Sequence, residues 1–269
     1  MGQVVHTLPE GGAVFGIASF GEEIYVFRWH LEQAEIEVYN VISYRIDRRL
    51  PVPFSHRITD MTSCEHYRCI YLADPIANCV HRLDVQGQAK RWEVADKPQG
   101  LSVNGARSLL ATCQSRVIKE FSSFGKLLRE IRLPDTVINP WHARQLATGE
   151  FIVCHGEIDD ALRRVCKICA DGNRIVHSQQ ASDTGHPYGL PRHLAVDQNQ
   201  FVFVADITNR RVTLLSPTLG YVHEVVTGEL LKWFPCRIFL DGRRKRLYVT
   251  DNEFEDGTYK SGRVVVFTV

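Results

Sequence analysis

The chain has 269 residues, of which 44% are hydrophobic and 23% are charged, and its formal net charge is +1. This length fits one large domain or two small ones with a sizeable buried core, and the composition is that of an ordinary folded protein. The near-zero charge excludes a general electrostatic attraction to nucleic acid or to anionic membranes, so such a partner would need a local basic patch.

The opening residues, MGQVVHTLPEGG, lack the basic and apolar regions of a secretory signal. No apolar run along the chain approaches the length of a membrane-spanning helix. The eight cysteines are scattered through apolar segments, which is typical of reduced core thiols. We therefore expect a monomeric cytoplasmic protein with no membrane partner.

Short apolar runs with a period of two residues recur along the chain, and no window has a convincing helical period. Six of these runs end about 40 to 50 residues apart. Their last residues are Arg28, Asp74, Cys113, His155, Asp206 and Asp251. Six strand-rich units of this length predict an all-β fold, a six-bladed β-propeller in which each unit is one four-stranded blade.

Proline supports the same division, because it precedes four of these strand ends by 15 or 16 residues, at Pro98, Pro140, Pro191 and Pro235. Proline cannot donate a ladder hydrogen bond and therefore suits the first residue of a strand. Each unit then contains strands a, b, c and d, with a beginning at the proline and b ending at the aspartate or its substitute. The expected blades cover approximately residues 10–52, 56–95, 97–134, 138–180, 186–228 and 231–269.

The last unit contains only three strands, whereas the chain begins with a strand that belongs to no complete blade. An open ring would leave bare sheet edges, so we expect residues 3–8 to pair with residues 263–269 as the fourth strand of blade six. The chain is thus expected to be a single domain closed by its two ends.

The segment LPRHLAVDQNQFVFVADITNRRVTLL resembles an NHL repeat through Pro191, Val196-Asp197, Val204-Ala205-Asp206 and Asn209-Arg210-Arg211-Val212. Blades two and six match the same pattern in part. The resemblance implies a six-bladed NHL propeller similar to the NHL domains of tripartite-motif proteins, which bind RNA or protein. Another propeller of this kind is the zinc-dependent lyase that matures amidated peptides. The fold alone therefore does not identify an activity.

The top face of a propeller, made of its d–a and b–c loops, is the preferred contact surface because rigid blades hold variable loops there. We expect a non-catalytic scaffold that binds a protein partner, or another macromolecule, on this face and needs no cofactor. The residues expected at the top face or the channel mouth are Trp141, His142, His155, His193, Arg237, Asp206 and Asp251.

A metal-dependent enzyme, similar to the amidating lyase or to a lactonase, is an alternative, because His142, His155 and His193 could converge on the channel as metal ligands. The competing interpretation is structural. In it, the aspartate at each strand-b end accepts backbone and arginine hydrogen bonds that tie adjacent blades together, and a histidine can be its partner. No serine–histidine–aspartate order, phosphate-binding loop or dinucleotide motif favours an enzyme.

An RNA-binding NHL domain is the second alternative, with Trp29, His30, Trp141 and Trp233 available for base stacking. The basic clusters, however, are divided between the two faces, whereas an RNA reader needs them on one. The Cys166–Cys169 pair has the spacing of a metal or redox motif, but residues three apart in a strand face opposite ways.

Overall fold

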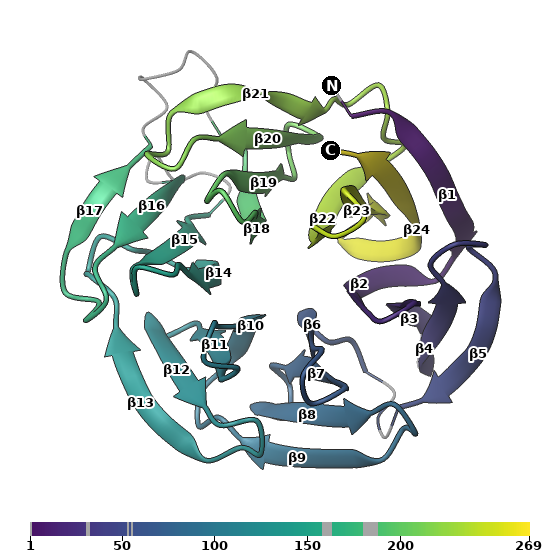
Figure 1. The fold of residues 1–269 in the computed structure, drawn as a ribbon, viewed down its shortest axis with the longest axis horizontal. Helices are drawn as coiled ribbons and strands as arrows, with labels where there is room; N and C mark the ends of the chain where they lie inside the picture. The colour runs from purple at the N-terminus through teal and green to yellow at the C-terminus, as the bar shows by residue number, and fades with distance from the viewer. Residues whose placement is uncertain (1, 31–32, 53, 55, 158–162, 180–187) are drawn as a thin grey trace.

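The computed structural model describes residues 2–30, 33–52, 54, 56–157, 163–179 and 188–269. Across these residues the chain forms six four-stranded antiparallel sheets that surround a central axis (Figure 1). The all-β, six-bladed propeller expected from the sequence is confirmed. In the described ranges, no helix is long and apolar enough to cross a membrane.

The first three blades follow one another along the chain, and each begins with its innermost strand. Blade one contains β2 (Ala13–Phe20), β3 (Glu23–His30), β4 (Gln33–Asn40) and β5 (Ile46–Pro51). Blade two contains β6 (Asp60–Cys64), β7 (Cys69–Asp74), β8 (Cys79–Asp84) and β9 (Ala89–Glu93). Blade three contains β10 (Pro98–Val103), β11 (Leu109–Cys113), β12 (Val117–Phe121) and β13 (Leu127–Arg132).

The other three blades repeat this order, except that the last takes its outer strand from the start of the chain. Blade four contains β14 (Pro140–Gln145), β15 (Phe151–His155), β16 (Arg164–Ile168) and β17 (Ile175–Ser178). Blade five contains β18 (Pro191–Val196), β19 (Val202–Asp206), β20 (Arg211–Leu215) and β21 (Tyr221–Val226). Blade six contains β22 (Phe234–Asp241), β23 (Arg246–Glu255), β24 (Thr258–Thr268) and β1 (Val4–Gly11).

The two ends of the chain close the ring, as predicted. Strand β1 runs antiparallel to β24, with Val4 opposite Phe267 and Leu8 opposite Val264. The clasp is longer than residues 3–8, since its pairing continues to Gly11 opposite Gly262. In Figure 1 both ends lie beside the last blade. The pairing covers the edge of β24 that an open ring would expose.

Burial follows the position of each strand within its blade. Strand b is buried on both faces in blades two to five, for example at every residue of β7, because neighbouring blades pack on either side. The outer strand β13 is mostly exposed and carries charged side chains. Each of the six interfaces between neighbouring blades has its own hydrophobic cluster. The core is therefore a ring of six blade-to-blade layers.

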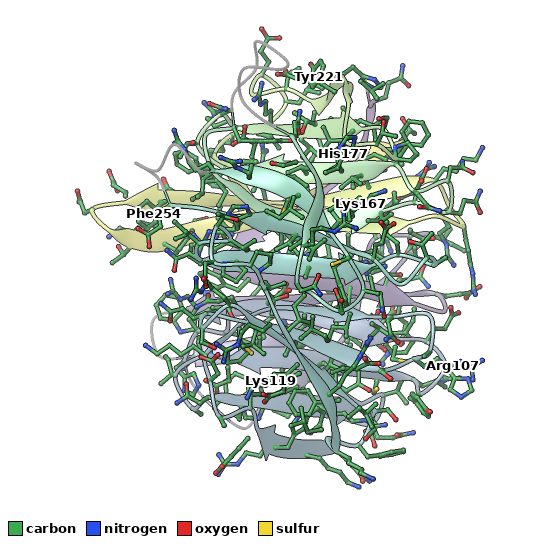
Figure 2. The ribbon with its side chains drawn as sticks, turned by 90° about the vertical axis from the view of Figure 1, so that its left-hand side faces the viewer. Arg107, Lys119, Lys167, His177, Tyr221 and Phe254 are labelled. Atoms are coloured by element: carbon green, nitrogen blue, oxygen red, sulfur yellow. The ribbon has the colours of Figure 1, made fainter. Side chains whose placement is uncertain are left out.

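The connections between strands define the two faces of the ring. We call the face that carries the b–c and d–a connections the top face, and the face that carries the a–b turns the bottom face. The β23–β24 hairpin, with Phe254 near its tip, extends beyond the body on the top side, whereas Arg107 lies on the opposite side (Figure 2).

Candidate functional site

Equivalent positions on the six inner strands bring ionisable side chains to the central axis. Each residue occupies the same position of its strand a, which in most blades lies beside a β-bulge. His193 pairs with Ala205 at this position in blade five, and Asp60 pairs with Ala73 in blade two. The six residues are Gly16, Asp60, Gly100, His142, His193 and Arg237. The two glycines belong to blades one and three, and the four ionisable groups belong to blades two, four, five and six.

Asp60 is the centre of this ring, which we call the axial cluster. Its Oδ1 lies 3.3 Å from His193 Nε2 and 3.2 Å from Arg237 Nε, and its Oδ2 accepts a 2.7 Å hydrogen bond from the Leu101 N–H. His142 Nε2 is 3.7 Å from the same Oδ2. One carboxylate therefore contacts residues of four other blades.

Burial sets the protonation of the axial cluster. It lowers the pKa of His142 and of His193, so both imidazoles are neutral at pH 7. Burial also opposes ionisation of Asp60, but His193 and Arg237 outweigh it and hold the pKa of that carboxyl at about 2. Asp60 and Arg237 therefore form the charged pair, with the histidines as neutral partners.

The axial cluster has the donor types of a metal site, since Asp60, His142 and His193 each place a ligand atom within 4.8 Å of the others. Their bonding does not fit a metal, however. Arg237 occupies the same carboxylate, His142 Nε2 is bonded to the Leu101 carbonyl at 3.0 Å, and a cation beside the guanidinium would be repelled. The axial cluster is therefore a structural contact that joins several blades at the axis.

The aspartates that end strand b accept backbone and arginine hydrogen bonds, as the structural interpretation of the sequence expected, but these bonds lie within one blade and do not tie adjacent blades together. Asp206 accepts hydrogen bonds from the Gly189 and Leu190 N–H groups and from Arg211. Asp251 does the same with Lys232, Trp233 and Arg263. Each carboxylate thus ties the d–a connection to strands b and c of its own blade.

The sequence-predicted contact residues lie deeper than a shallow interface allows. His142, His155, His193, Arg237, Asp206 and Asp251 are all buried, and three of them have no exposed surface. Of the seven residues, only Trp141 is part-exposed, and its indole N–H donates to the Gly156 carbonyl at 2.8 Å. These six side chains are not available to a partner on the surface. His142, His193 and Arg237 turn inward to the axis, and His155, Asp206 and Asp251 lie at buried positions of strand b.

The top face has a different set of groups, which we call the top cluster: Phe15, Arg57, Trp141, Arg192 and Tyr259. Phe15 is buried, and the other four are exposed or part-exposed. The Arg192 guanidinium lies 4.0 Å from the centre of the Trp141 ring. The Arg57 guanidinium lies over both Phe15 and Tyr259, at 5.2 and 5.7 Å from the ring centres. Phe15 and Tyr259 pack edge to face with centres 4.9 Å apart. Guanidinium groups are commonly held on aromatic faces in this way.

Neither arginine of the top cluster has a hydrogen bond or a carboxylate partner within the part of the chain that the structure describes. Burial lowers the pKa of Arg192, and the charges of Arg237 and Arg57 act in the same direction. Two like charges therefore face one region of the top face, and no carboxylate of the described ranges balances them. Sequence reasoning missed Arg57, Arg192 and Tyr259, because no motif marks them.

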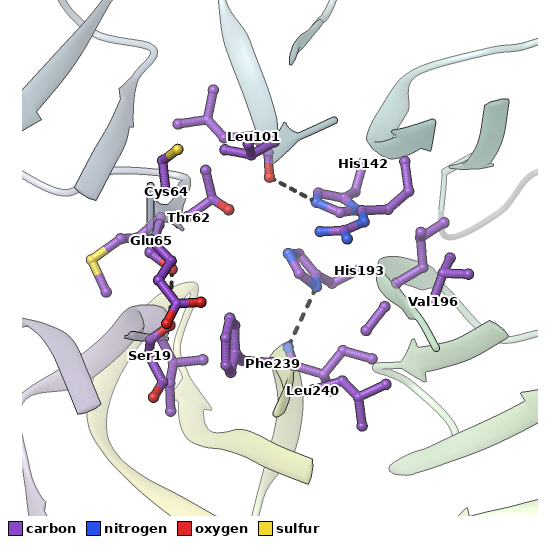
Figure 3. A pocket seen from close by; sticks show the side chains of 18 of the residues that line it. Ser19, Thr62, Cys64, Glu65, Leu101, His142, His193, Val196, Phe239 and Leu240 are labelled. Carbon is purple, nitrogen blue, oxygen red and sulfur yellow. Dashed lines mark hydrogen bonds between the residues drawn. The ribbon is translucent and has the colours of Figure 1, made fainter. Parts of the chain in front are cut away.

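A pocket of about 350 Å³ occupies the bottom side of the central axis, and its inner end is formed by His142 and His193 (Figure 3). Thr62, Glu65 and Phe239 are among its other lining residues. Arg144 also lines it, and burial lowers the pKa of this guanidinium. In the described ranges of the chain, Arg144 has no carboxylate partner.

The basic clusters that could have favoured RNA are largely engaged within the protein. Arg48 pairs with Glu23, and Arg243 pairs with Glu65. Arg244 pairs with Asp241 at 2.9 Å. Arg210 donates to several carbonyls, among them that of Leu231 at 2.6 Å. These contacts leave fewer free cations for a phosphate backbone.

All eight cysteines lie in the described ranges and are free thiols. Cys166 is buried, and burial raises the pKa of its thiol. Cys169 lies at the c–d turn, where its Sγ contacts Asp171 and Asn173. The two residues thus have separate environments.

No family model and no curated protein matches the chain. Several solved structures share its fold. The virginiamycin B lyase from Staphylococcus aureus has 13% identity and a TM-score of 0.67, with 97% of this chain and 98% of that chain covered. The β-propeller domain of Cps50 (Swd1) from Myceliophteria thermophila has 12% identity and a TM-score of 0.67, with both chains fully covered. At this identity the likeness shows the six-bladed propeller fold alone.

Proposed function

We propose that this protein is a non-catalytic interaction module that binds an acidic segment of a partner protein at the top cluster. The observation that carries the proposal is the pair of guanidinium groups, Arg57 and Arg192, that lie on aromatic rings without a carboxylate partner in the described residues. A carboxylate from a partner would complete both ion pairs and would form charge-assisted hydrogen bonds with the planar groups.

A protein segment fits this surface because apolar area adjoins the charges. Phe254, on the projecting β23–β24 hairpin, is 48% exposed and packs against Tyr259 with ring centres 4.9 Å apart. Tyr259 in turn contacts Phe15 in the top cluster. Aromatic residues and arginine are enriched among the residues that carry most of the energy at protein interfaces. We therefore expect an acidic side chain with an apolar neighbour in the bound segment.

We also propose that the blades are NHL-type repeats. In blade five, Asp206 accepts hydrogen bonds from Asn209 and Arg211, the polar residues that follow the apolar triplet of the repeat pattern. In blade six, Asp251 and Arg263 have the same relationship. A recurring side-chain bond at one register position supports a shared repeat ancestry.

The proposal is tested by selecting from a phage-displayed random peptide library on the immobilised protein. We expect enrichment of peptides that contain Asp or Glu beside an aromatic or aliphatic residue. Reversal of both charges, by Arg57→Glu and Arg192→Glu, should weaken the selected peptides by about tenfold or more, because like charges would then face each other.

Arg107→Glu is the matched control, since Arg107 is a cation on the bottom face. It should leave peptide affinity unchanged. Enriched peptides without acidic residues would contradict the proposal, as would equal binding by the wild-type protein and the doubly substituted variant.

Arg144 favours a second candidate function, the binding of a small organic anion in the bottom pocket. A volume of about 350 Å³ is in the range of small-molecule sites. The Arg144 guanidinium at its wall has no carboxylate partner among the described residues and would be stabilised by a bound carboxylate or phosphate. Thermal-shift screening with small carboxylates and phosphate esters tests this. A shift that is lost in Arg144→Gln supports it, and the absence of any shift across the panel contradicts it.

A further inference from the structure

Asp74, the strand-b end of blade two, has an environment that the other blades lack. Its Oδ1 accepts hydrogen bonds from the Ile76 and Ala77 N–H groups at 3.0 and 2.8 Å. Because these backbone N–H groups bond Oδ1, the second oxygen, Oδ2, is left to accept hydrogen bonds from side chains. The carboxylate has no exposed surface and therefore needs a partner for its charge.

In blades five and six, an arginine opposite the strand-b aspartate supplies that partner. Asp206 pairs across the sheet with Arg211, and Asp251 with Arg263, and each guanidinium Nε bonds Oδ2 at 3.0 and 2.8 Å. In blade two, the residue opposite Asp74 is Cys79. The aspartate is kept, but its arginine is replaced by a thiol.

Two histidines accompany that thiol. His81 Nε2 lies 2.9 Å from Asp74 Oδ2, and His56 Nε2 lies 2.7 Å from the same oxygen. Cys79 Sγ is 3.4 Å from His81 Nε2 and 3.9 Å from that Oδ2. Two imidazole nitrogens and one sulfur thus converge on a single carboxylate oxygen.

The cluster is positioned for this convergence. Cys79 and His81 are two residues apart on β8 and therefore share one face of the sheet. Phe54 packs on both imidazoles, with ring centres 5.1 Å from His56 and 4.4 Å from His81. Asp74, Cys79 and His81 are buried, and their ligand atoms all lie within 4.8 Å of one another. The His56 side chain is half-exposed and lies on the solvent side of these three residues.

We propose that His56, Asp74, Cys79 and His81 form a structural binding site for a zinc-class divalent metal ion. One thiolate, two imidazoles and one carboxylate are ligands that Zn²⁺ accepts, and four protein ligands suit a closed tetrahedral site. Donor atoms about 3.3 to 3.8 Å apart would surround such an ion. Asp74, Cys79 and His81 already place their ligand atoms within 4.8 Å of one another, and His56, which bonds Asp74 Oδ2, would move toward them to complete the site. The ion would replace the missing arginine and tie the segment before β6 to strands β7 and β8.

The site is tested on the whole protein, purified with a non-chelating reductant, saturated with Zn²⁺ and desalted. Metal analysis should give about one zinc ion per chain. Loading with Co²⁺ should give the visible absorption of tetrahedral cobalt and a thiolate-to-cobalt charge-transfer band. Cys79→Ser should abolish that band and lower the zinc affinity by more than about tenfold.

Cys113→Ser is the matched control, because Cys113 is a buried thiol at the strand-b end of the next blade and should not affect metal binding. His56→Ala covers the case in which Cys79→Ser fails to fold, because His56 is half-exposed and precedes β6; it should also lower affinity by about tenfold or more. Zinc content well below one ion per chain would overturn the proposal. Wild-type affinity in both the Cys79 and His56 variants would do the same.

Discussion

Asp60 and His193 meet across the central axis, with 3.3 Å between carboxylate and imidazole, although they belong to blades two and five on opposite sides of the ring. Arg237 of blade six joins the same carboxylate. A propeller has no central core of its own, because each blade packs only against its neighbours. This contact therefore connects blades that are otherwise linked only around the circumference.

Replacement of the central carboxylate should destabilise the ring strongly. Asp60→Asn leaves the Arg237 guanidinium buried without its counter-ion, and removal of one partner from such a pair costs about 3 kcal/mol of unfolding free energy. Urea unfolding measures this loss. Glu65→Gln, which removes an exposed partner of Arg243, should cause almost no change. A similarly small effect of Asp60→Asn would refute the role of the axial cluster.

Acidification should weaken the fold before the carboxylates titrate. Burial lowers the pKa of His142 and His193, with Arg144 acting in the same direction and Asp60 opposing it. The unfolded chain therefore binds more protons below the ordinary histidine pKa of about 6.5, and each histidine adds up to about 1.4 kcal/mol of lost stability per pH unit. Their stabilising contribution is complete above that pH and declines below it. Urea titrations across this range should give a shallower pH slope for His142→Asn, and an unchanged slope would disprove the assignment.

Two glycines of blade three provide a matched pair. A Cβ on Gly100 would lie 2.4 Å from the Trp141 carbonyl oxygen and 2.9 Å from the His142 Cα, whereas a Cβ on Gly105 would meet nothing within 4 Å. Gly100→Ala should lower the unfolding free energy by about 1 to 3 kcal/mol because the backbone must shift, and Gly105→Ala should be nearly neutral. Thermal unfolding compares them. Equal stability of the two variants would exclude a close approach of blades three and four.

The metal site and the top cluster should be coupled if both proposals hold, because His56 immediately precedes Arg57. A bound ion would restrain the segment that carries this guanidinium. Removal of zinc with a chelator, followed by desalting, should therefore weaken a selected acidic peptide by a few-fold, and renewed zinc should restore it. Fluorescence anisotropy measures both states. Equal affinity of the zinc-free and zinc-loaded protein would show that the two sites are independent.

The repeat architecture was predictable because propeller blades depend on local signals. Strand alternation, turn residues and the proline at the start of strand a recur in most units, and the three-stranded last unit requires the first strand of the chain to close the ring. The proline register also brought His142, His193 and Arg237 to equivalent positions. It could not find Asp60, because blade two has Ile58 and Thr59 before β6 and no proline there.

The contact surface was predicted less well for a physical reason. A register position states which residues are equivalent, but not whether a bulge turns their side chains toward the axis or toward solvent. The bulge between Pro191 and His193 turns this histidine inward. Arg57 and Tyr259 come from a connection and a hairpin that differ between blades, so the repeat carries no information about them.

The most direct test of the proposed interaction is a charge exchange across it. An acidic peptide selected on the wild-type protein, and the same peptide with its acidic residue replaced by lysine, are titrated against the wild-type protein and against Arg192→Glu. We expect the wild-type protein to prefer the acidic peptide by about tenfold or more and Arg192→Glu to prefer the lysine peptide. Equal affinity of the wild-type protein for both peptides, or an unchanged preference in Arg192→Glu, would contradict the proposed interaction.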